Sequence, residues 1–275
     1  MKRNEKEENE YVLGTECDEL ARLGLQHQLW LEQAAAAWER AGFHRGQNLL
    51  DVGCGPGFAT LDLAQRVGPR GNVVAVDISR RFLTHLEESA RARGLANIRT
   101  VQSSVERMDV GESSFDGAYA RWVLCFVRRP PAVVGQVARR LKRGGVFVIQ
   151  DYFRYEGITI APECEAFRRV FRAVCKSWRV RGGDPDVGCR LPGLLHHAGF
   201  DIKEITPLVR LARPGSTLWE WPDTFFDIYL PALVKMRLIT SAHERAFRRE
   251  WAKRSRDPGA FFTSPPMIEI IAVKR

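Results

Sequence analysis

The sequence predicts an α/β fold, in which a seven-stranded, mostly parallel sheet carries helices on both faces. Two observations lead to this prediction. Between residues 46 and 152, short apolar runs alternate with helical segments of ten or more residues, which is the pattern of βαβ units. The chain has 275 residues, 45% of them hydrophobic, which suffices for one large domain with an insertion.

Residues 1–45 are expected to form an N-terminal helical cap. Thr15 precedes an acidic turn and is a candidate N-cap. One helix is predicted to end at Gly24, and a second to run over about 25–41 before Gly42.

The core is predicted over residues 46–208, with an insertion at about 153–190. Its strands are expected at residues 48–52, 72–77, 97–102, 115–120, 146–151 and 200–205, with a seventh strand at 267–273 inside the final segment 263–275. Its helices are expected at residues 58–67, 80–93, 132–141 and 191–198, and the helix of the insertion at 163–178. Gly144 and Gly145 are expected to form a turn before the fifth strand.

Residues 209–262 are predicted to form a helical lid that is rich in aromatic side chains. Five of these side chains are candidates for contacting a flat or hydrophobic ligand: Trp219, Trp221, Phe225, Phe226 and Tyr229. Spacings of three and four residues fit one helix face. The alternative is that these rings form the lid's own core.

Composition and charge limit the classes of partner. The formal net charge of +9 fits either an anionic partner or arginines spread over solvated surfaces. The six cysteines show no CxxC pair and no metal-ligand spacing, so we expect free thiols, a cytoplasmic location and no metal. No apolar run is long enough to span a bilayer and no secretory signal is visible, so we expect no membrane association.

A glycine-rich turn carries the strongest functional signal. The apolar strand at 48–52 includes Asp51 and is followed by Gly53, Gly55 and Gly57 before a helix. Such a turn lets a ligand approach the backbone at a helix N-terminus.

The next predicted strand ends in a second carboxylate. Asp77 closes the apolar run 73–77, 20 residues after Gly57. A carboxylate at this place can accept hydrogen bonds from both ribose hydroxyls of an adenosine-type ligand. The turn and the two carboxylates together are far more specific than the glycines alone.

With these residues the sequence resembles the class I S-adenosylmethionine (SAM)-dependent methyltransferases, specifically their small-molecule type. Residues 50–57 and 74–79 look like the first two motifs of that family, and residues 115–118 look like its fourth-strand motif. Residues 141–146 resemble the segment before the fifth strand, with Arg143 where the family usually has proline. The resemblance implies a Rossmann-like core, SAM as cofactor and S-adenosylhomocysteine as product.

The resemblance also implies roles for single residues. The expected cofactor contacts are Tyr11, Gln28, Asp51, Gly53, Cys54, Gly55, Gly57, Asp77, Ile78, Ser104, Val105, Arg121 and Trp122. Asp77 would hold the ribose and Ile78 would pack on the adenine. The family often has Gly-Asp-Ala after the third strand, whereas this chain has Ser-Ser-Val at 103–105, where a serine hydroxyl can still accept a hydrogen bond from the adenine amino group.

Methyl transfer requires a base only where the acceptor atom is protonated. The candidates for contacting the acceptor are His27, Asp151 and Tyr152, because they lie near the expected cofactor mouth or at the carboxyl end of the fifth strand. His196 and His197 are further candidates, with surface or capping roles as the alternative.

The predicted function is methyl transfer to an oxygen, nitrogen or carbon atom of a small, aromatic or hydrophobic metabolite. Nucleic-acid methyltransferases are disfavoured because the fourth strand ends in Ala-Arg-Trp-Val at 120–123 and no RNA-binding module is recognisable. A protein acceptor and a non-catalytic SAM-binding protein remain alternatives. We expect a monomer or a homodimer.

Overall fold

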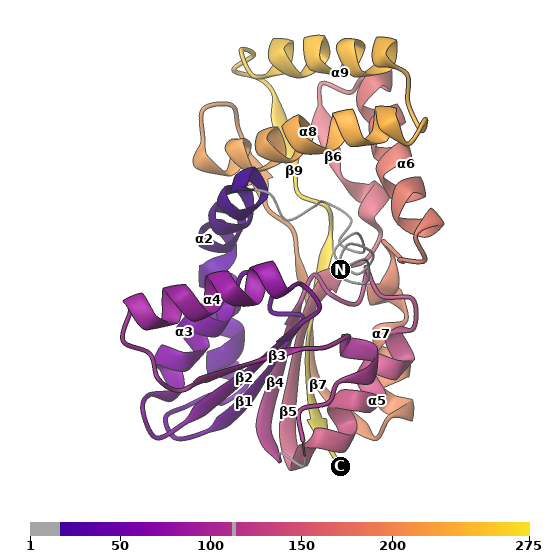
Figure 1. The fold of residues 1–275 in the computed structure, drawn as a ribbon. Helices are drawn as coiled ribbons and strands as arrows, with labels where there is room; N and C mark the ends of the chain where they lie inside the picture. Colours follow the sequence, from indigo (N-terminus) through magenta and orange to yellow (C-terminus); the bar gives the residue numbers. More distant parts are fainter. Residues whose placement is uncertain (1–16, 112–113) are drawn as a thin grey trace, which may run out of the picture.

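A computed structural model describes residues 17–111 and 114–275 of the chain (Figure 1). Its central sheet has seven strands in the order β3-β2-β1-β4-β5-β10-β7. The strands are β1 (Asn48–Val52), β2 (Asn72–Asp77), β3 (Ile98–Gln102), β4 (Phe115–Arg121), β5 (Leu141–Tyr152), β7 (Phe200–Leu208) and β10 (Met267–Lys274). All neighbours are parallel except β10, which runs antiparallel to β5 and β7. The predicted α/β fold is confirmed.

Helices cover both faces of this sheet. The helices of the core are α2 (Cys17–Arg40), α3 (Phe58–Val67), α4 (Arg80–Ala92), α5 (Pro130–Arg140) and α7 (Leu191–His197). Trp38 of α2 packs with Leu63 of α3 and Leu49 of β1 on one face. On the other face, Val133 of α5 and Leu195 of α7 pack with Phe147. No helix in residues 17–111 and 114–275 combines the length and the apolar character needed to cross a membrane.

A layer of three helices lies beyond the carboxyl ends of the strands (Figure 1). These helices are α6 (Glu165–Val180), α8 (Thr217–Lys235) and α9 (Ser241–Arg254). Their rings pack together: Phe226 lies 4.5 Å from Phe247 and 4.9 Å from Trp251 between ring centroids. These rings hold the three helices together and belong to the same buried cluster as Phe147 of the sheet.

The lid is mostly helical, and short strands that the sequence did not reveal lie at both of its ends. A three-stranded sheet joins β6 (Thr159–Ala161), β9 (Phe261–Thr263) and β8 (Leu211–Ala212), all antiparallel. Its strands are two or three residues long and come from segments far apart in the sequence. Local patterns cannot reveal such pairings, because their hydrogen-bond partners are distant along the chain.

The expected helix break at Gly24 is absent, because α2 is continuous from Cys17 to Arg40. A Cβ atom on Gly24 would lie 3.3 Å from the ring of Phe58. Glycine therefore serves close packing of α2 against the start of α3. The candidate N-cap Thr15 lies outside the described residues. The expected turn at Gly144 and Gly145 lies inside β5, which already begins at Leu141.

The fully buried carboxylate of Asp151 anchors the loop that follows β4. Its Oδ2 atom accepts the backbone N–H groups of Val123 at 3.2 Å, Leu124 at 2.7 Å and Cys125 at 3.3 Å. Its Oδ1 atom accepts the N–H of Tyr152 at 2.8 Å. Burial raises the pKa of Asp151 to about 6. We call residues 121–128 the β4 loop below.

We predict opposite effects of alanine at two glycines. A Cβ atom on Gly117 would lie 2.4 Å from the ring of Phe43, whereas one on Gly135 in α5 meets nothing closer than 3.7 Å. Gly117→Ala should lower the free energy of unfolding by about 1–3 kcal/mol through overpacking. Gly135→Ala should raise it by about 0.5–1 kcal/mol, because alanine loses less backbone entropy in a helix. Urea denaturation measures both, and a stable Gly117→Ala protein would contradict the packing described here.

Asp151→Asn should also lower the free energy of unfolding. The amide cannot replace a carboxylate oxygen as an acceptor, so at least one buried N–H group loses its partner, at a cost of about 1–3 kcal/mol. The control is Asp201→Asn, because Asp201 is exposed and lies 3.9 Å from Arg275. Equal denaturation midpoints for the two variants would contradict an anchoring role.

Candidate functional site

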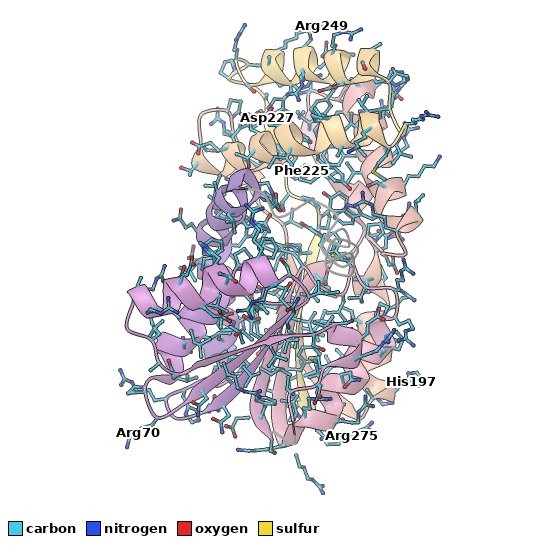
Figure 2. All side chains as sticks on the ribbon, in the orientation of Figure 1. Arg70, His197, Phe225, Asp227, Arg249 and Arg275 are labelled. Carbon is cyan, nitrogen blue, oxygen red and sulfur yellow. The ribbon has the colours of Figure 1, made fainter. Side chains whose placement is uncertain are left out.

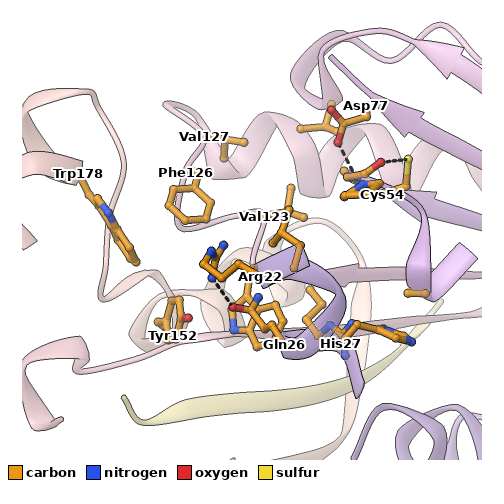
Figure 3. Close-up of a pocket in the computed structure, with 18 of the residues that line it drawn as sticks. Arg22, Gln26, His27, Cys54, Asp77, Val123, Phe126, Val127, Tyr152 and Trp178 are labelled. Atoms are coloured by element: carbon orange, nitrogen blue, oxygen red, sulfur yellow. Dashed lines mark hydrogen bonds between the residues drawn. The ribbon is translucent and has the colours of Figure 1, made fainter. Parts of the chain in front are cut away.

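A cavity of about 980 Å³ lies between the carboxyl ends of the strands and the helices α2, α6 and α8. Figure 3 shows Asp77 and Cys54 at one end of it and Trp178 and Tyr152 at the other. Val123, Phe126 and Val127 of the β4 loop lie between the two ends. Ligand pockets in proteins range over about 300–1,000 Å³, so this cavity has room for two small ligands.

The glycine-rich turn forms the floor of the first end. Gly53, Gly55 and Gly57 all have positive φ angles, of 69°, 54° and 85°. A Cβ atom on Gly53 would lie 2.7 Å from Val123, and one on Gly57 would lie 2.4 Å from Leu86. On Gly55, which lines the cavity, it would meet nothing within 4 Å. The turn is therefore closely packed against the protein at Gly53 and Gly57 and open to the cavity at Gly55.

Two carboxylates flank this turn. Asp77 accepts the N–H of Gly55 through Oδ2 and the N–H of Ser79 through Oδ1, at 2.8 and 2.9 Å. Asp51 accepts the Thr60 hydroxyl at 2.6 Å. Burial raises the pKa of both carboxyl groups, that of Asp51 to about 6, and the bonds they accept oppose this shift. Both side chains line the cavity, where cationic or hydroxyl groups of a ligand can reach them.

The loops after β2 and β3 complete this end. Ile78, Ser104 and Val105 line the cavity. The Ser104 hydroxyl accepts the N–H of Glu106 at 3.3 Å and begins the short 3-10 helix η1 (Val105–Arg107). An apolar side chain and a hydroxyl thus face the space beside Asp77.

The N-terminal helix contributes residues that differ in part from the expected ones. His27 lines the cavity, but Gln28 is exposed and does not. Gln26 lines it instead, and its Oε1 atom accepts hydrogen bonds from Arg22 at 2.9 Å and from Trp221 of α8 at 2.8 Å. Gln26 therefore ties α2 to the lid. Tyr11 lies outside the described residues.

Aromatic rings surround the second end, which we call the aromatic chamber. Its rings come from the β4 loop, β5, the short 3-10 helix η2 (Tyr155–Gly157), α6, α8 and the small sheet: Phe126, Tyr152, Tyr155, Phe171, Trp178, Trp221, Phe225, Phe226 and Phe262. Trp178 lies 4.8 Å from Phe126 and 4.7 Å from Tyr155 between ring centroids. In Figure 2, Phe225 projects from α8 toward the sheet. Burial raises the pKa of Tyr155 well above its usual value, so its hydroxyl stays protonated.

Two of the five lid aromatics do not reach the cavity. Trp219 stacks on Trp251 at 4.7 Å and donates to the Ser255 hydroxyl. The Tyr229 hydroxyl lies 2.7 Å from that of Ser177 in a buried contact. Both side chains therefore belong to the core of the lid, whereas Trp221, Phe225 and Phe226 line the chamber.

The three expected acid–base candidates occupy different environments. Asp151 does not line the cavity, and both of its oxygens accept backbone N–H groups. His27 lines the cavity, but both of its ring nitrogens are engaged, by Asp62 and by Arg121. Tyr152 lines the chamber beside Tyr155. His197 lies on α7, away from the lid (Figure 2), and neither it nor His196 lines the cavity.

Sequence reasoning missed many residues of the cavity, among them Arg22, Gln26, Phe126 and Trp178. Trp178 is on the apolar face of an amphipathic helix. The sequence reveals the helix and its apolar face, but it does not reveal that this face lies at the cavity. Phe126 follows β4 at the edge where ligands bind in open α/β sheets, and that position was a usable signal.

Comparisons with known proteins agree with this geometry. Residues 50–149 match a family described as a methyltransferase domain. The chain is 32% identical over 147 residues to a 2-phytyl-1,4-naphtoquinone methyltransferase of Nostoc punctiforme, a match that covers 53% of this chain and 61% of that protein. It is 30% identical over 204 residues to a 37.1 kDa protein in a transposon of Streptomyces fradiae, covering 70% of this chain and 57% of the relative.

These two matches span about three-fifths of each relative's length. Among solved structures, the geranyl diphosphate C-methyltransferase of Streptomyces coelicolor superposes with a TM-score of 0.57 at 18% identity, over 90% of this chain and 80% of that one. That similarity supports the fold. Residues 50–149 thus match a methyltransferase domain, and the strand order and the glycine turn with its two carboxylates agree with the class I S-adenosylmethionine-dependent type.

Proposed function

We propose that this protein transfers the methyl group of SAM to a small, flat, hydrophobic acceptor, and that the quinone precursors methylated by its relatives exemplify the acceptor class. The observation that carries the proposal is the continuity of the cavity. One space joins the glycine turn and Asp77 to the aromatic chamber. A methyl donor at one end and an acceptor at the other would meet beside the β4 loop.

The first end fits the cofactor. The open face of Gly55 leaves room for a ligand where a Cβ atom would otherwise project. Each Asp77 oxygen accepts one backbone N–H and retains a lone pair for a ribose hydroxyl. Ile78 offers an apolar surface for the adenine, and Asp51 offers a carboxylate for the ammonium group.

The residues of the chamber act mainly through position and exclusion of water. When bound, SAM supplies an electrophilic methyl group on its sulfonium. Trp178, Phe126 and Tyr155 enclose the space opposite the glycine turn and would hold a flat acceptor in one orientation. The protonated Tyr155 hydroxyl is suited to donate a hydrogen bond to an acceptor oxygen. Both ring nitrogens of His27 are engaged, and Asp151 does not line the cavity. The acceptor atom would therefore have to be nucleophilic without the help of either residue as a base.

Asp77→Asn should weaken binding of S-adenosylhomocysteine by at least about tenfold, because an amide offers one acceptor oxygen where the carboxylate has two. Titration calorimetry measures this directly. Asp257→Asn is a matched control, because Asp257 also accepts the N–H two residues ahead, at 2.8 Å, but lies outside the cavity. Unchanged affinity in Asp77→Asn would contradict the assigned cofactor end.

The acceptor class is tested by release of S-adenosylhomocysteine from SAM with hydroxynaphthoquinones and alkyl phenols, with RNA and peptides as competing classes. We expect turnover with the aromatic small molecules. Phe225→Ala should raise KM for the acceptor by about tenfold through lost apolar contact, with little change in cofactor affinity. The control is Phe153→Ala, a partly buried phenylalanine that does not line the cavity. Turnover only with RNA or peptides would refute the proposal.

A further inference from the structure

Two arginines line the cavity where the aromatic chamber opens to solvent. Arg128 is the last residue of the β4 loop, two residues after Phe126, and Arg181 follows α6, three residues after Trp178. The rings of Phe126 and Trp178 are in contact in the chamber. Because both arginines line the cavity and are also exposed, they lie at its rim. We call this part of the rim the mouth of the chamber.

The backbone brings the two arginines to the same part of the rim. The N–H of Asp184 donates to the carbonyl of Cys125 at 2.8 Å, which joins the segment after α6 to the β4 loop. The side chain of Arg128 runs along Gly182, where a Cβ atom would lie 2.8 Å from its Cγ and 3.4 Å from its Nε. Gly182 has a φ angle of 89° and leaves this space open. The guanidinium of Arg128 therefore begins beside the residue that follows Arg181.

The carboxylates of the cavity do not neutralise Arg128. Asp51 and Asp77 belong to the end formed by the glycine turn. The third carboxylate of the lining, Glu106, pairs with Arg129: it accepts the backbone N–H at 2.8 Å and lies 3.3 Å from Nε. In the described part of the chain, no carboxylate pairs with Arg128. Its positive charge can therefore act on a ligand at the mouth.

The mouth combines this charge with an apolar surface. Val180 lines the cavity next to Arg181, and 69% of it is exposed. Farther inside, the chamber is enclosed by rings such as those of Phe126 and Trp178. A charged group buried among rings without a partner is costly, whereas at the mouth it keeps contact with water and with a guanidinium. The arrangement fits a ligand with an apolar body and one anionic end.

We propose that the methyl acceptor carries an anionic group, a carboxylate or a phosphate monoester, which Arg128 binds at the mouth while Arg181 adds a second positive charge. This inference rests on the proposed function and narrows its acceptor class to anionic aromatic molecules. The planar N–H donors of a guanidinium match the oxygens of both anions. The contact would also orient the acceptor, because the anion would point outward and the opposite end of the ring toward the glycine turn.

The test compares ligands that share a ring and differ in charge. 6-Hydroxy-2-naphthoate has its hydroxyl and carboxylate at opposite ends, and its methyl ester is neutral. In calorimetric titrations of protein saturated with S-adenosylhomocysteine, the acid should bind at least about fivefold more tightly than the ester. 6-Hydroxy-2-naphthyl phosphate is the second anion, and the tighter binder of the two identifies the preferred group. Raising NaCl from about 0.05 M to about 0.5 M should reduce the preference for the anions, because salt screens exposed charges.

Arginine variants locate the anion. Arg128→Gln should remove most of the preference for the acid over the ester, and the double variant with Arg181→Gln should remove the rest, with the affinity for the ester changed by less than about twofold. Arg249→Gln is the matched control. It removes the same charge from α9 of the lid (Figure 2), where Arg249 is exposed and does not line the cavity. This control should keep the full preference.

The outcomes separate the two proposals. Equal affinities of the wild-type protein for acid and ester would overturn the anion site alone, and so would a preference that the double variant retains. Failure to bind S-adenosylhomocysteine, or failure of all three ring compounds to bind in its presence, would overturn the proposed function instead. Circular dichroism melting checks that each variant is folded. The salt series needs no variant and tests the charge dependence on the wild-type protein.

Discussion

The hydrogen bonds that Asp151 accepts from the β4 loop determine how the cavity is built. They hold Val123, Leu124 and Cys125 against the end of β5. Val123 in turn packs against Gly53 of the glycine turn, and Phe126 packs against Trp178 of the lid. The β4 loop therefore contacts both ends of the cavity. Asp151 itself is buried and does not line the cavity, but its hydrogen bonds fix the positions of the two ends relative to each other.

The backbone is strained at the start of this loop. Trp122 has a φ angle of 54°, in the left-handed region that large side chains rarely occupy. Its indole N–H points to the sulfur of Met267, and its backbone N–H donates to Gln150. The turn at Trp122 lets Arg121 face α2 and α3 while Val123 reaches the glycine turn. The surrounding hydrogen bonds compensate for this unfavourable backbone conformation.

The fold was predictable from the sequence where its determinants are local. The glycine turn, Asp51 and Asp77 lie within 27 residues of one another, and the structure brings them to one end of the cavity. The continuity of α2 and the small sheet depend on partners far along the chain, such as Phe58 for Gly24 and Thr263 for Thr159. The aromatic chamber was not predictable for the same reason. Trp178 lines the cavity and Trp219 does not, and this difference depends on how the helices of the lid pack. The sequence predicted Gln28 at the cavity, whereas Gln26 lines it. Which residue of a helix faces a site depends on how the helix packs against the rest of the protein.

The small sheet has a mechanical consequence. A lid on a single flexible loop can swing open as one body about one hinge. Here β6 precedes α6, β8 precedes α8, and β9 follows α9, and β9 is hydrogen-bonded to both β6 and β8. They act as a strap that joins both ends of the lid to the insertion after β5. Moving α8 and α9 outward without α6 would break this ladder, so the pairing makes the lid and the insertion after β5 one mechanical unit.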